Sequence, residues 1–114
     1  MTKNILLSVK NGLGIPESVN NFDEELLLNI NSSFSELYQL GFPKDEAFIA
    51  DMESDWNSIL GDNKDLEFIK TYVILSVKLL FDPPQASTVM DAQKAKIAEM
   101  VFRISVAVEL GGES

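Results

Sequence analysis

The stretch Lys64–Pro84, KDLEFIKTYVILSVKLLFDPP, is the longest apolar segment of the chain and decides the fold. When it is drawn as a helix, its polar side chains fall on one stripe, made of Glu67, Lys70, Thr71 and Lys78. A helix that is apolar over most of its circumference packs in the middle of a bundle. Pro83 disfavours a helical conformation at Asp82, so the sequence predicts a central helix over about residues 64–82.

This central segment is not a membrane span. Lys70 and Lys78 lie inside it, and the apolar run between them is far shorter than the roughly 20 residues that a bilayer requires. The N-terminal residues also lack the pattern of a signal peptide. We therefore expect no membrane association.

Composition narrows the classes of protein further. A length of 114 residues predicts one domain, and a hydrophobic content of 46% is enough to build a core. The absence of cysteine excludes disulfides and thiolate metal sites, and it fits a reducing compartment. The net charge of −9 argues against a surface that grips nucleic acid, because phosphate binding requires clustered Lys and Arg.

Four further helices are predicted around the central one. A short helix over residues 2–12 ends at the glycines that follow it. A second begins at Asn21, whose side chain would cap it with Glu24 as capping-box partner, and runs to about Leu40 before a left-handed Gly41. A brief third helix covers about residues 52–60.

The last helix begins at a Ser87 or Thr88 cap and runs to about Val108. It is followed by a flexible C-terminal tail of about residues 109–114. The predicted fold class is thus all-α, a small bundle of four to five helices around the central apolar helix. We expect residues 1–114 to form a single helical domain.

Catalytic chemistry has little support in this sequence. Histidine is absent, which removes the commonest general base and the usual nucleophile pairs. No phosphate-binding glycine motif occurs. We predict that the protein is not an enzyme and that it has no catalytic, cofactor-binding or metal-binding residues.

One acidic cluster partly matches a calcium-binding loop. Asp51, Glu53, Asp55 and Asn57 alternate like the first ligands of a calcium loop. The sixth position of that loop is Trp56, where the sharp turn requires Gly. The preferred interpretation is a solvated, acidic helix start that the helix dipole favours.

The best interaction candidate is the uncharged end of the last helix, with side chains Ile104, Val106, Val108 and Leu110. These residues either dock onto a partner or are covered by the core of their own chain, and the pattern leaves both open.

Charge is distributed unevenly along the chain. Residues 41–67 contain eight acidic and two basic side chains, whereas residues 70–103 contain five basic and three acidic ones. The two possible interpretations are ordinary solvated helix faces, or head-to-tail self-association in which one face of a subunit meets a different face of its neighbour.

Several short sequences together resemble the head–tail connector (adaptor) proteins of long-tailed bacteriophages and prophages. The most specific is Phe81-Asp82-Pro83-Pro84 after a long apolar helix. The similarity extends from about Ile5 to Arg103, and the order and spacing of the elements agree. The other matching sequences are Leu13-Gly14-Ile15, Phe22-Asp23, Ile30-Asn31, Leu37 with Leu40-Gly41, Trp56, Thr71-Tyr72 and Lys78-Leu79-Leu80.

The resemblance implies a structural virion protein. Such a subunit assembles in the host cytoplasm into a ring of about a dozen copies beneath the portal protein. The ring extends the DNA channel, through which DNA passes without sequence-specific binding, and it joins the capsid to head-completion or tail proteins. The resemblance implies that the C-terminal segment contacts the portal. The residues themselves leave two positions open for the acidic segment, which either lines the channel or faces the outside solvent; the candidate channel-facing side chains are Asp45, Glu46, Asp51, Glu53 and Asp55.

The residues alone equally support a second hypothesis. A small helix bundle with one exposed apolar end is also typical of a regulatory module that binds one protein partner as a monomer or dimer.

Overall fold

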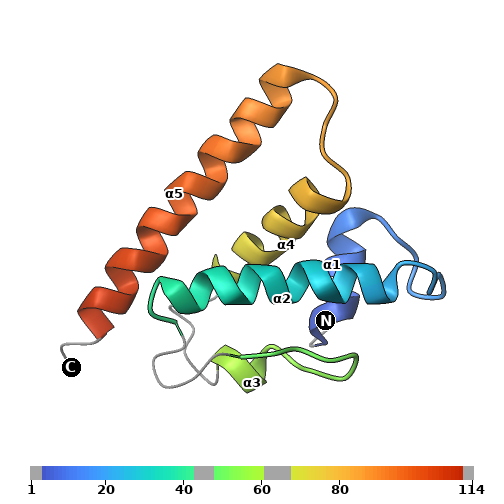
Figure 1. The fold of residues 1–114 in the computed structure, drawn as a ribbon, viewed down its shortest axis with the longest axis horizontal. Coiled ribbons are helices and arrows are strands. Elements are labelled where there is room, and N and C mark those ends of the chain that lie inside the picture. Colours follow the sequence, from blue (N-terminus) through green and yellow to red (C-terminus); the bar gives the residue numbers. More distant parts are fainter. Residues whose placement is uncertain (1–3, 43–47, 61–67, 112–114) are drawn as a thin grey trace.

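Five helices make up the part of the chain that the structure describes, which is residues 4–42, 48–60 and 68–111 of a computed structural model (Figure 1). These residues contain no strand, and one isolated bridge pairs Asn4 with Asp55. The predicted all-α fold class is therefore confirmed. The helices are α1 (Ile5–Leu13), α2 (Asp23–Gln39), α3 (Asn57–Leu60), α4 (Phe68–Phe81) and α5 (Ser87–Gly111).

The predicted central helix is confirmed as α4, which packs against α1, α2 and α5. It buries Ile69, Tyr72, Val73 and Val77. The helix ends at Phe81, and the amide of Asp82 still donates to the carbonyl of Lys78 at 2.8 Å. The predicted residues 64–67 lie outside the described residues.

The buried side chains of α4 belong to one hydrophobic cluster that all the longer helices share. Trp56 fills the space between α1 and α2: its ring lies 6.4 Å from that of Phe34, and its Nε1 donates to Ser8 Oγ at 3.0 Å. Close approach also matters, because a Cβ on Gly12 of α1 would lie 2.6 Å from Ile74 Cγ2 of α4. Glycine thus lets these two helices touch.

A buried cation, which the sequence did not reveal, joins α1 to α2. Lys10 is 1% exposed, and its Nζ lies 3.0 Å from Asp23 Oδ1. The same Nζ donates to the carbonyl of Glu17 at 3.0 Å. A buried charge must be paired in this way, because an unpaired one carries a large desolvation cost.

The helix ends differ from the predicted caps. The prediction that Asn21 caps α2 is wrong, because the cap position is Phe22 and no side chain bonds there. The first turn of α2 is instead acidic, which complements the positive end of the helix dipole. A side-chain cap is present on α1 instead, where the Oδ1 of Asn4 accepts a hydrogen bond from the amide of Leu7 at 2.9 Å. Gly41 is left-handed at φ 107°, as predicted.

The third helix is shorter than the predicted residues 52–60, and it begins at Asn57. The preceding residues are held in a different conformation, because the amide of Ile5 donates to the carbonyl of Ser54 at 2.9 Å and Asn4 pairs with Asp55. The Asn4 side chain also donates to the carbonyl of Met52 at 3.0 Å. These contacts pin the loop to the start of α1, so a helix cannot form until they end.

The last helix is the longest, with 25 residues or roughly 38 Å, and it runs along one edge of the molecule (Figure 1). Its first intrahelical bond runs from the amide of Met90 to the carbonyl of Ala86, so Ala86 holds the cap position rather than Ser87 or Thr88. At its other end it passes the predicted end at Val108 and continues to Gly111. Of the predicted tail, residues 109–111 are helical and residues 112–114 lie outside the described residues.

Candidate functional site: two exposed faces

The predicted docking residues at the end of α5 point in different directions. Ile104 is 0% exposed and belongs to the core of its own chain, so it offers no surface to a partner. Val108 is half-buried, packs on the same core and lies close to Gly41. Val106 is 38% exposed on the opposite side of the helix. The side chain of Leu110 lies outside the described residues.

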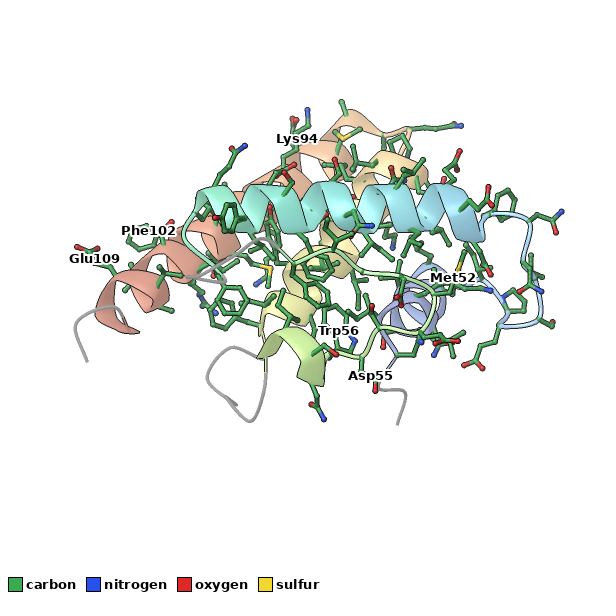
Figure 2. All side chains as sticks on the ribbon, turned by 60° about the horizontal axis from the view of Figure 1, so that its bottom comes forward. Met52, Asp55, Trp56, Lys94, Phe102 and Glu109 are labelled. Carbon is green, nitrogen blue, oxygen red and sulfur yellow. The ribbon has the colours of Figure 1, made fainter. Side chains whose placement is uncertain are left out.

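Val106 is part of a longer exposed strip on the outer side of α5. Phe102, one turn earlier, is 69% exposed, and Figure 2 shows it pointing away from the other helices. The helical spacing places two exposed small residues on the same side. We call this strip the α5 ridge, defined as Ala95, Ala98, Phe102 and Val106.

Basic side chains flank the α5 ridge. Arg103 Nη2 lies 3.0 Å from Glu99 Oε1, and Lys96 Nζ lies 4.0 Å from Glu99 Oε2. All three side chains are about half exposed or more. Exposed pairs within one helix contribute little energy, typically 0.3–0.5 kcal/mol, so these cations can exchange partners at small cost.

A second exposed apolar feature lies on α2. A shallow groove there is lined by Glu24, Leu27, Leu28 and Asn31, and we call it the α2 groove. Leu28 is 73% exposed. Asn31 holds the backbone of Ala50 with two hydrogen bonds and so fixes the adjoining loop next to α2. That loop exposes Ile49, whose side chain is 77% exposed.

The predicted channel-facing acids lie partly in this same loop. Asp51, Glu53 and Asp55 are exposed, and Figure 2 shows Asp55 at the surface. Asp45 and Glu46 lie outside the described residues. The structure therefore leaves three of the five candidates available to solvent.

Asp51 also has a local structural role. Its Oδ1 accepts from the amide of Glu53 at 2.9 Å and from Ser54 Oγ at 3.0 Å. These hydrogen bonds, the Glu53 amide first, hold the pKa of the Asp51 carboxyl below its usual value. Among the described residues no group of three or more acidic side chains is placed to hold a metal ion. The carboxylate of Asp51 closes its own turn.

The exposed cations are confined to the second half of the described chain, whereas acidic side chains are exposed in both halves. Before α4, the one basic residue that the structure describes is Lys10, which is buried against Asp23. The exposed cations Lys94, Lys96 and Arg103 all lie on α5, which also carries the exposed acids Asp91, Glu99 and Glu109. The α2 groove is thus on an acidic half of the molecule, and the α5 ridge is beside the basic side chains.

The described residues present two exposed apolar faces, the α5 ridge and the α2 groove. The family model of the phage connector proteins matches residues 5–111. The chain therefore belongs to the phage connector protein family, and the resemblance seen in the sequence is confirmed.

This family is a structural one, so the chain has a connector-type role among the proteins of a virion. Comparison with curated proteins and with solved structures finds no significant match. No helix within the described residues is both long enough and apolar enough to cross a bilayer.

Two of the exposed residues were missed by sequence reasoning. Leu28 ends a run of three leucines, and a helix with one buried face cannot bury all three. Phe102 lies on the polar side of an otherwise amphipathic helix. A large apolar residue on the wrong side of a helical wheel was the available signal in both cases.

Proposed function

We propose that the chain is the subunit of a ring of about a dozen copies that assembles beneath the portal protein. The ring extends the DNA channel and joins the capsid to head-completion or tail proteins in the virion. The observation that carries the proposal is the family match over residues 5–111. In this role residues 1–114 act as one structural domain without catalytic or cofactor chemistry.

The two exposed faces support a ring. A ring forms when one face of each subunit binds a different face of the next and the rotation closes. The α5 ridge and the α2 groove differ in shape, and exposed cations lie beside the ridge whereas acids lie beside the groove, so the two faces can complement each other.

The acidic loop supports a channel through which DNA slides. Exposed carboxylates repel phosphate, so a wall that carries Asp51, Glu53 and Asp55 does not hold the duplex. We place Asp45 and Glu46 in the same wall. The portal contact is assigned to the end of α5 beyond the α5 ridge, with Leu110 as its candidate residue.

The test is negative-stain imaging of the protein mixed with its portal protein at high concentration. We expect rings, or portals decorated by an added layer. If neither forms and the protein remains a monomer or dimer, the connector role fails and a small protein-binding module becomes the better interpretation.

A further inference from the structure

The α5 ridge has no partner within the described chain. The main packing partner of α5 is α4, which is a little over half its length. Met100 and Ile104 bury the inner side of α5 against the core. The outer side presents Phe102, which is 69% exposed, and Val106 to solvent as one contiguous apolar strip, and such a strip marks an interaction site.

The α2 groove has complementary properties. It exposes Leu28 beside Glu24, and Glu25 is exposed in the same first turns of α2. No basic side chain of the described residues before α4 lies at the surface, since Lys10 is buried. The groove therefore favours an occupant that carries an apolar side chain with cations beside it.

The two faces lie on opposite sides of the molecule. In Figure 1 the N-terminal end of α2 is on the right, and the C-terminal half of α5 is on the left. A subunit therefore cannot satisfy its own groove with its own ridge. A second copy can, and it leaves its own groove free for a third.

We propose that the α5 ridge of one copy docks in the α2 groove of the next copy. Phe102 lies against Leu28, and Lys96 and Arg103 exchange Glu99 for Glu24 and Glu25 of the neighbour. This proposal rests on the proposed ring, and it identifies the α5 ridge and the α2 groove as the surfaces between its subunits. Charge complementarity selects this arrangement over an α5–α5 pair, which would leave Leu28 and its acidic neighbours uncovered.

Cross-linking tests the contact directly, because the chain contains no cysteine. Ser32→Cys places a thiol one turn after Leu28, and Ala98→Cys places one a turn before Phe102, both at exposed positions. A short bis-maleimide cross-linker is added to the double variant at high protein concentration, alone and with the portal protein. We expect a ladder of dimers, trimers and larger species in at least one of these mixtures.

The single variants identify the geometry. With either single variant alone, the cross-linker should give no covalent dimer on a denaturing gel. A mixture of the two single variants should give covalent dimers that contain one copy of each, and nothing larger. Dimers from Ala98→Cys alone would show an α5–α5 contact and overturn the proposal. Absence of the ladder both with and without the portal protein would overturn it as well.

Side-chain substitutions in the double-cysteine variant show which residues contribute to the affinity between subunits. Phe102→Ser or Leu28→Ser should weaken association about thirtyfold or more, as loss of a central anchor does. Val89→Ser removes another exposed apolar side chain of α5 away from the ridge and should leave the ladder unchanged. An equal loss in all three variants would contradict the assignment.

Reversing the charges on both faces provides a rescue experiment. Glu24→Lys with Glu25→Lys should abolish the ladder, and adding Lys96→Glu with Arg103→Glu should restore it. The outcome is separable from that of the proposed function. Rings on the portal without this ladder would refute the contact alone, and a ladder without rings or portal decoration would refute the connector role alone.

Discussion

Tyr72 is a core residue whose hydroxyl group depends on one carboxylate. The hydroxyl donates to Glu36 Oε2 at 3.0 Å and thereby joins α4 to α2. Burial, followed by the charge and hydrogen bond of Glu36, raises the pKa of Tyr72 to about 12 from 10.0. The folded protein therefore retains this proton at a pH where the unfolded chain has released it.

This difference predicts an alkaline loss of stability. The contribution of Tyr72 is complete below pH 10 and is lost as the pH rises to about 12, because deprotonation then favours the unfolded chain. The loss is at most about 3 kcal/mol. In urea unfolding, the free energy of the wild type should fall relative to that of Tyr72→Phe over this interval. A gap that stays constant would contradict the assignment.

Asn31 is a second residue with an effect beyond its own helix. Its side chain donates to the Ala50 carbonyl at 3.0 Å and accepts from the Ala50 amide at 2.7 Å. Asn31→Ala should cost about 1–3 kcal/mol, because it leaves both groups of a buried backbone unit without a partner. Thermal unfolding measures this loss.

Asn29→Ala is the matched control for that change. It makes the same exchange in the same helix, so the gain in helix propensity is equal and cancels. We expect its melting temperature to equal or exceed that of the wild type. A similar loss in both variants would mean that helix α2, and not the loop contact, is responsible.

At the scale of elements, α5 carries two apolar faces with different roles. Ile104 is fully buried and Val106 is exposed, although only two positions separate them. Ile104→Ala should cost about 2–5 kcal/mol, as cavities in cores do. Val106→Ala should change stability by about 0.5 kcal/mol or less.

Thermal unfolding of both variants checks this assignment. The drop for Ile104→Ala should exceed about 8 °C. Comparable drops would place Val106 in the core and remove it from the ridge. Since Ile104 supports the fold, a truncation that probes portal binding should begin after Val108.

At the scale of the whole molecule, the separation of charge predicts salt-dependent self-association. The acidic half and the cations of α5 attract across a subunit contact, and added salt screens that attraction. Sedimentation of the wild type should show weaker association as ionic strength rises from about 0.05 M to 1 M. Glu24→Gln with Glu25→Gln should flatten this dependence, and an equally steep dependence would contradict the contact.

The sequence predicted the fold well where periodicity is strong. The apolar run of α4 and its proline stop predicted a central helix, and the described part, Phe68–Phe81, matches it. The third helix was predicted too long, since the Asn4–Asp55 pairing joins residues about 50 positions apart and leaves no local signal. The buried Lys10 was missed for a related reason, because its partner Asp23 lies on another helix.

The candidate site was less predictable than the fold. The end of α5 was recognised as apolar, but periodicity alone does not say that Ile104 turns inward and Val106 outward until the position of α4 is known. The α2 groove ends at Asn31, whose hydrogen bonds to the backbone of Ala50 have no sequence pattern. A surface is defined by what tertiary packing leaves uncovered, so it follows from the fold rather than from the sequence.

The position of Trp56 has a practical consequence for all of these measurements. It is the one tryptophan of the chain, and it lies in the core beside Phe34 and Ser8. The α5 ridge lies on another helix and points outward (Figure 2). Intrinsic fluorescence should therefore report the integrity of the subunit and stay unchanged when subunits associate. One optical signal can thus separate misfolding from failed assembly in every variant described above.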